Sequence, residues 1–132
     1  MSNTYRNEKS FESSNNDLLI DQIRLCIVSD HNSGNYKKFP NGQGEIEFEV
    51  RNGQLQKNVI SHRENLMADD EAKTVPVSRK HLEVILRKIT DRITTWDPIN
   101  YAKIRLEICL EDEVTLRDLQ IGIRFESHFK RQ

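Results

Sequence analysis

The stretch that decides the fold is residues 78–98, SRKHLEVILRKITDRITTWDP. On a helical wheel, every charged helix residue lies outside an arc of roughly 100° that holds six apolar residues: Leu82, Ile85, Leu86, Ile89, Ile93 and Trp96. Ser78 is a favoured N-cap, and Asp97-Pro98 ends the pattern, because a residue before proline avoids helical geometry. The stretch therefore predicts one amphipathic helix that packs its apolar side on a sheet.

The first turn of this predicted helix is basic. A helix start is electrically positive and favours acidic side chains, yet here Ser78 is followed by Arg79, Lys80 and His81. Free amides and cations together favour an anion, so we hypothesise that these four residues bind a phosphate or a partner's carboxylate. The alternative is local, because the acidic residues 69–71 lie close enough in sequence to fold back and pair with them.

Two strands are expected after the helix. In residues 103–110, KIRLEICL, apolar and other residues alternate, and EDE at 111–113 is typical of a turn. The alternation then changes phase between 114–116 and 119–125. Since a one-residue slip turns every side chain to the opposite face, we predict a bulge near Arg117-Asp118.

A hairpin is expected before the helix, in residues 45–60, EIEFEVRNGQLQKNVI. The central pair Asn52-Gly53 suits a type I′ turn, which needs positive φ at both positions. Counting outward from this turn places Phe48 opposite Lys57. A lysine at an inward position predicts that the second strand lies near a sheet edge.

Residues 17–29, DLLIDQIRLCIVS, fit two patterns. The β-branched residues near the end favour a strand over 22–29, which is the structure we expect. The alternative is a short helix with an apolar stripe at helical spacing, capped by Asn16 or Asp17.

Together these elements predict an α+β fold, with one helix on a mainly antiparallel sheet of four to five strands in the order β-ββ-α-ββ. We expect residues 17–132 to form a single domain and the polar residues 1–16 to form a flexible tail. The expected core residues are Leu25, Ile27, Phe48, Val50, Leu86, Ile89, Ile93, Trp96, Leu106, Ile108, Ile121 and Phe125.

The composition narrows the class of protein. The chain has 132 residues and a net charge of −1, without the basic excess that nucleic-acid binding usually requires. It shows no apolar run long enough to span a membrane and no signal-peptide pattern, so we expect a cytoplasmic protein without membrane contact. Cys26 and Cys109 match no metal or redox motif and are expected to be free thiols, with a single bridge as the alternative.

Motifs for catalysis are absent from the sequence. It has no GxGxxG, phosphate-binding P-loop or HExxH motif, and no two histidines are three or four residues apart. We therefore expect no cofactor, no metal site and no enzymatic activity. The less favoured alternative is a hydrolase or nuclease built on His62 with Glu47, Arg51 or Arg105.

The predicted strand 45–51 carries an acidic row. Glu45, Glu47 and Glu49 alternate with apolar residues, followed by Arg51, and Arg105 is expected to lie across from them. These five residues are our candidates for a partner-facing strand. The alternative is an ordinary solvated sheet face with cross-strand charge pairs.

The expected function is therefore a small non-catalytic interaction protein, such as a regulatory subunit, an adaptor or an inhibitor of a protein partner. Self-association through an edge strand is a further expectation, because unpaired backbone groups attract another strand. The alternative function is nucleic-acid binding through Arg51, Arg105 and Arg124 on the sheet and the basic helix start.

Overall fold

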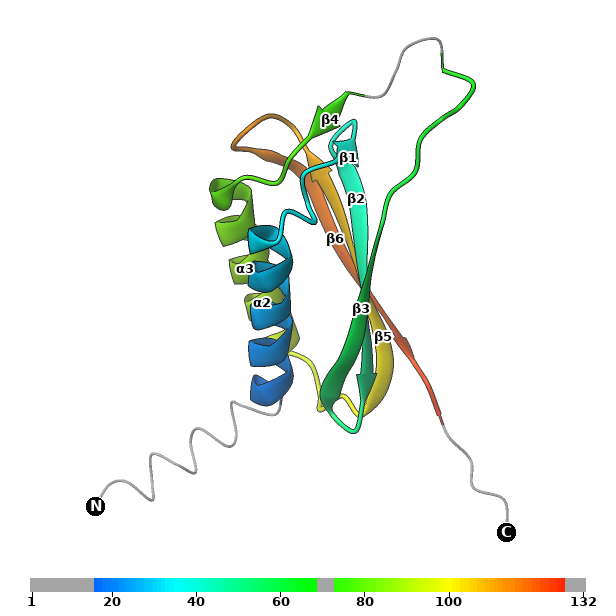
Figure 1. Ribbon diagram of the computed structural model, residues 1–132. Coiled ribbons are helices and arrows are strands. Elements are labelled where there is room, and N and C mark those ends of the chain that lie inside the picture. Colours follow the sequence, from blue (N-terminus) through cyan, green and yellow to red (C-terminus); the bar gives the residue numbers. More distant parts are fainter. Residues whose placement is uncertain (1–15, 69–72, 128–132) are drawn as a thin grey trace, which may run out of the picture.

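In the computed structural model, which describes residues 16–68 and 73–127, two helices cover one face of a four-stranded antiparallel sheet (Figure 1). The strand order is β3-β2-β5-β6, and a separate small sheet pairs β1 with β4. The α+β class is confirmed. The elements are α2 Asp17–Asn32, β1 Phe39–Pro40, β2 Gln43–Arg51, β3 Gln54–Ser61, β4 Thr74–Val75, α3 Arg79–Thr94, β5 Tyr101–Leu110 and β6 Leu116–Phe125.

The first element is a helix, so the prediction of a strand over 22–29 is wrong. In α2 the stripe Leu19, Ile20, Ile23 and Ile27 is buried at helical spacing. Leu25, which was expected in the core, points away and is 71% exposed. Packing of this stripe outweighs the weak strand preference of β-branched residues, which depends strongly on context. The main elements therefore run α-ββ-α-ββ.

Asn16 contacts both helices, although it was predicted to belong to the flexible tail. Its side chain is buried, and its amide nitrogen lies 3.1 Å from the Trp96 carbonyl and 3.2 Å from the Asp97 carbonyl, just past the end of α3. Its oxygen accepts from the Ile99 amide at 3.0 Å. Asn16 thus satisfies backbone groups at a helix end, which otherwise lack partners. The rest of the predicted tail, residues 1–15, lies outside the described residues.

Helix α3 matches its prediction. It begins after Ser78 and ends at Thr94, shortly before Asp97-Pro98. Its buried side chains, besides His81, follow the predicted apolar stripe; they are Leu82, Ile85, Ile89 and Ile93. Leu86 and Trp96 are partly buried and pack against the same core. The amphipathic pattern therefore identified both the helix and the side that it buries.

The hairpin of β2 and β3 forms around the predicted turn. Asn52 and Gly53 have φ values of 53° and 75°, as a type I′ turn requires. The predicted pairing of Phe48 with Lys57 is wrong, because a bulge shifts the register between Glu49 and Val50. Lys57 instead lies opposite Glu49, and Phe48 faces Asn58. As predicted, β3 is an edge strand.

The predicted bulge in β6 is confirmed. Cys109 pairs with Asp118 and Leu110 pairs with Leu116, so Arg117 is the extra residue. Phe125, which was expected in the core, is 67% exposed. Figure 1 shows that the last part of β6 runs away from both helices, so neither described helix covers the end of this edge strand.

The core lies between the helices and the sheet. Of the other predicted core residues, Ile121 is partly buried, and Ile27, Phe48, Val50, Leu106 and Ile108 are fully buried. In the described part of the chain, no helix is long and apolar enough to cross a membrane.

Candidate functional site

The basic start of α3 is not a cluster of four free donors. Arg79 and Lys80 are exposed, whereas His81 has no accessible surface. The Ser78 hydroxyl accepts from the His81 amide at 3.2 Å, and the Ser78 amide donates to His81 Nδ1 at 3.0 Å. This is a capping box in which histidine takes the position usually held by glutamate. The acidic residues 69–71, proposed as local partners, lie outside the described residues.

His81 also connects α3 to the β5–β6 loop. Its Nε2 lies 3.2 Å from the carbonyl oxygen of Thr115. Since Nδ1 accepts a hydrogen bond from the Ser78 amide, the ring hydrogen lies on Nε2, which donates it in a hydrogen bond to the Thr115 carbonyl. The structure thus gives two of the four predicted anion-binding residues, Ser78 and His81, a role in folding. Arg79 and Lys80 remain available to solvent.

We expect His81→Ala to lower the free energy of unfolding by about 1–3 kcal/mol, because it removes the side chain that bonds to the Ser78 amide and the Thr115 carbonyl and leaves a cavity behind. The neighbouring substitution Lys80→Ala is the control, with an expected change within about 0.5 kcal/mol. Urea unfolding followed by circular dichroism measures both. Equal midpoints for the two variants would show that the His81 contacts do not stabilise the fold.

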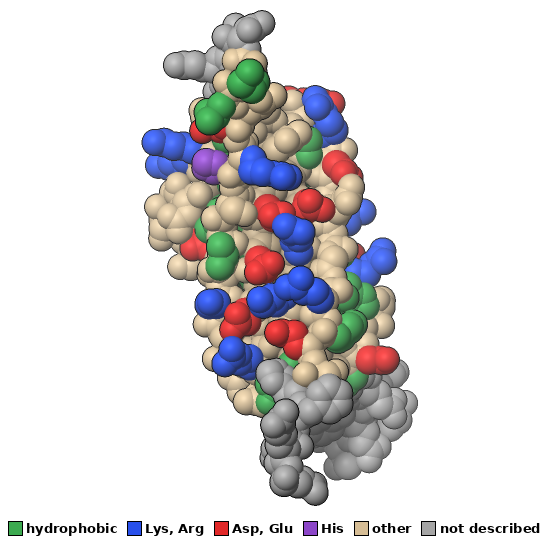
Figure 2. Space-filling view, turned by 90° about the vertical axis from the view of Figure 1, so that its right-hand side faces the viewer, with side chains coloured by type: hydrophobic (Ala, Val, Ile, Leu, Met, Phe, Trp, Pro, Cys, Tyr) green, Lys and Arg blue, Asp and Glu red, His purple; other side chains and the backbone are tan. Residues whose placement is uncertain are grey.

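The predicted partner-facing strand lies on the outer face of the sheet. Figure 2 shows basic and acidic side chains interspersed over this face. Arg105 Nε lies 2.8 Å from Glu45, and Glu49 contacts Arg51 at 3.3 Å and Lys57 at 3.8 Å. The structure therefore brings the predicted residues together, but mostly as pairs with one another. Such exposed pairs contribute little to stability, typically about 0–1 kcal/mol each.

His62 borders a shallow hollow of about 420 Å³ on the same face. Glu45 and Arg105 also line this hollow, whereas Glu47 and Arg51, the other residues of the hypothetical hydrolase, do not. Within residues 16–68 and 73–127, no three histidine, cysteine or acidic side chains lie close enough together to hold a metal ion.

Both cysteines are free thiols on different elements, Cys26 on α2 and Cys109 on β5. Burial, together with the nearby Asp30 carboxylate, raises the pKa of Cys26 to about 11. The thiol is therefore protonated at neutral pH. Since the thiolate is the reactive form, Cys26 is a poor nucleophile.

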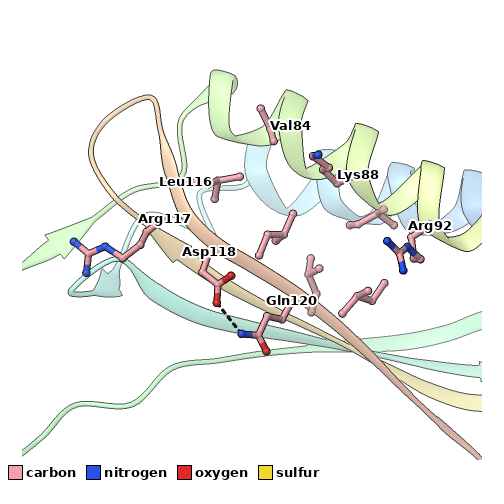
Figure 3. Close-up of a pocket in the computed structure, with 11 residues that line it drawn as sticks. Val84, Lys88, Arg92, Leu116, Arg117, Asp118 and Gln120 are labelled. Carbon is pink, nitrogen blue, oxygen red and sulfur yellow. Dashed lines mark hydrogen bonds between the residues drawn. The ribbon is translucent and has the colours of Figure 1, made fainter.

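A groove of about 670 Å³ runs between α3 and β6 (Figure 3). Lys88 and Arg92 of α3 border this groove, and both are exposed. Asp118 and Gln120 point away from α3, and the Gln120 side-chain amide donates a hydrogen bond to the Asp118 carboxylate at 2.7 Å. The apolar lining comes from both sides of the groove and from β5: Val84, Ile89, Leu106, Leu116, Leu119 and Ile121.

The outer edge of β6 carries backbone groups that point away from the sheet. The Glu126 amide donates to the Tyr101 carbonyl at 3.0 Å, which fixes this facing pair as a hydrogen-bonded one. Such pairs alternate with non-bonded pairs along an antiparallel ladder. Given the unbroken register down to Asp118, the amides and carbonyls of Leu119, Ile121 and Ile123 therefore point outward. No described strand lies on that side of β6.

The opposite sheet edge, β3, differs from β6 in being partly capped. The Gln22 side chain of α2 accepts from the Leu55 amide at 2.7 Å, and Asn58 bonds to Asp30 at 2.7 Å. Lys57 and the bulge beside it also discourage pairing with another strand. Of the two edges of the four-stranded sheet, β6 is therefore the one more open to strand addition.

The β6 edge and its groove were not identified from the sequence. The available signal was the alternation of Leu119, Ile121 and Ile123. Strand order, which makes β6 an edge, depends on pairings distant in sequence.

In comparisons with known proteins, the chain matches no family model, no curated protein and no solved structure.

Proposed function

We propose that this protein is a small non-catalytic interaction protein, a regulatory subunit, adaptor or inhibitor, that binds a protein partner at β6. The observation that carries the proposal is the outward row of backbone groups at Leu119, Ile121 and Ile123, beside an apolar groove. An extended segment added to such an edge gains main-chain hydrogen bonds, while a neighbouring groove receives its alternate side chains.

Side chains with catalytic potential have structural partners instead, which supports a non-catalytic role. His81 completes the capping box of α3 with Ser78, and Glu45 and Glu49 pair with basic side chains. The Cys26 thiol stays protonated at neutral pH because its pKa is raised to about 11. The proposal also places the protein in the cytoplasm, where free thiols such as those of Cys26 and Cys109 are usual.

Affinity capture with a matched pair of variants tests the proposal. Ile123→Lys puts a charge on the β6 edge, and Val59→Lys puts the same charge on β3, where Val59 is 49% exposed. We expect proteins captured from the native cell by the tagged wild type to be retained by Val59→Lys. Ile123→Lys should capture at least tenfold less of these proteins, as quantified by mass spectrometry.

Circular dichroism must first show that both variants are folded, because Ile123 also packs against the core. Capture of the same proteins in the same amounts by Ile123→Lys would contradict the proposal. Loss of capture by Val59→Lys alone would place the binding surface on the other sheet edge.

Nucleic-acid binding remains the second candidate and has less support. Two of the arginines assigned to it, Arg51 and Arg105, each contact a carboxylate on the outer sheet face. Acidic side chains interspersed among basic ones, as Figure 2 shows, weaken the attraction of that face for a phosphate backbone.

A further inference from the structure

We propose that the β6 edge binds a second copy of this chain, so that two sheets join antiparallel through β6 with Ile121 on the twofold axis. This inference rests on the proposed function, since it names the partner at that same edge. It differs from a general binding role because the sequence of β6 is complementary to itself in one antiparallel register.

The backbone supports this register. With Ile121 facing its own copy, Leu119 faces Ile123 of the second copy, and the reverse pair forms on the other side of the axis. All three residues point their amides and carbonyls outward, so each facing pair can exchange two hydrogen bonds. The free edges therefore meet donor to acceptor along the whole contact.

The apolar side chains also match. Leu119, Ile121 and Ile123 are partly buried and pack against the core on the helix side of the sheet. In the joined sheet they form a continuous apolar row with their counterparts, and the groove beside α3 in each copy opens toward this row. Burial of that row supplies the main driving force for association.

The charges select this register over its neighbours. On the outer face, Asp118 lies opposite Arg124 of the second copy, and the pair occurs twice because of the twofold symmetry. These residues form non-hydrogen-bonded pairs, in which side chains approach more closely. If the register shifts by two residues in one direction, Asp118 lies opposite Gly122 and the charge pair is lost. If it shifts by two residues in the other direction, Asp118 lies opposite Glu126, and the two acidic side chains repel each other.

Two features limit the assembly to a dimer. The twofold contact uses the β6 edge of both copies, and the remaining β3 edges are partly capped by α2. Lys88 and Arg92 of both copies border the joined grooves, but they are exposed, so solvent and salt screen their repulsion.

Disulfide trapping with two single-cysteine chains tests both the contact and its register. In a background of Cys26→Ser and Cys109→Ser, one chain carries Gln120→Cys and the other Gly122→Cys. In the proposed register these positions face each other about 4.5 Å apart between Cα atoms, within disulfide range. A side chain at Gly122 has space, because an added Cβ meets nothing within 4 Å.

We expect the mixture of the two chains, oxidised with oxidised glutathione, to give a covalent dimer on a non-reducing gel, with at least tenfold less from either chain alone. A dimer from Gln120→Cys alone or from Gly122→Cys alone would show a shifted register and overturn the proposal. No cross-linking in any combination would also overturn it.

Light scattering on the wild-type chain separates this inference from the proposed function. We expect the wild type to have twice the mass of the chain. Asp118→Arg should have the mass of a single chain, and Asp118→Arg combined with Arg124→Asp should restore the doubled mass. A monomer at every concentration would overturn self-pairing, whereas the affinity capture with Ile123→Lys and Val59→Lys would still test β6 as a binding edge for another protein.

Discussion

Replacing Ile89 with alanine is expected to lower the free energy of unfolding by about 2–5 kcal/mol, the range for removing a large buried aliphatic side chain. Ile89 is 3% exposed and belongs to the stripe of α3 that faces the sheet. The decrease in the free energy of unfolding has two sources: the stabilisation lost with the deleted apolar groups and the cavity that they leave behind. For a domain of this size, that is a large share of the total stability.

Arg87→Ala is the matched control, because Arg87 lies on the same helix but on its exposed side. It is expected to change the free energy of unfolding by less than about 0.5 kcal/mol. Urea unfolding followed by circular dichroism at the helix signal gives both values. Equal midpoints for the two variants would contradict the orientation of α3 on the sheet.

Asn16→Ala is expected to lower the free energy of unfolding by about 2–4 kcal/mol, because it removes the side chain that bonds to the buried Ile99 amide and to the Trp96 and Asp97 carbonyls. The Asn16 side chain contacts the carbonyls of Ile93, Trp96 and Asp97, and it accepts from the Ile99 amide. One side chain thus connects the start of α2 to the end of α3. Its removal also weakens the contact between the two helices.

Asn35→Ala serves as the control for Asn16, since Asn35 is exposed and makes a side-chain bond to Asp30 at 2.9 Å. We expect its effect to stay within about 0.5 kcal/mol. Thermal and urea unfolding of both variants measure the difference. If Asn16→Ala and Asn35→Ala unfold at the same temperature and the same urea concentration, the contacts of Asn16 do not stabilise the fold.

Features of the fold that depend on local pattern were predictable from the sequence. The stripe of α3 extends over several turns, so its period is unambiguous. The Asn52-Gly53 pair specifies its turn through backbone geometry alone. The phase change near Arg117 has a simple steric consequence, a bulge, which the structure confirms.

Features that depend on distant contacts were not predictable in this way. Residues 22–29 carry both a strand preference and a helical stripe, and the structure forms the helix, whose stripe packs in the core. The bulge in β3 has no turn residue to mark it. Its effect is to place Lys57 opposite Glu49, an oppositely charged pair that the simpler register does not form.

The candidate site was only partly predictable for the same reason. Ser78 was correctly assigned as an N-cap, but burial of His81 depends on Thr115, which lies 34 residues further along the chain. The acidic strand residues were identified, and their pairing with Arg105 depends on the β2–β5 contact. The β6 edge follows from strand order, which no local pattern encodes.

Residue-resolved hydrogen exchange along β6, recorded by NMR over a range of protein concentrations, tests most directly whether this edge is a binding surface. We expect the amides of Gln120 and Gly122 to be protected by β5 at every concentration. The amides of Leu119, Ile121 and Ile123 should exchange rapidly in dilute protein and become protected as the second copy binds. Protection of these three amides that is the same at every concentration would contradict the pairing of β6 with a second copy.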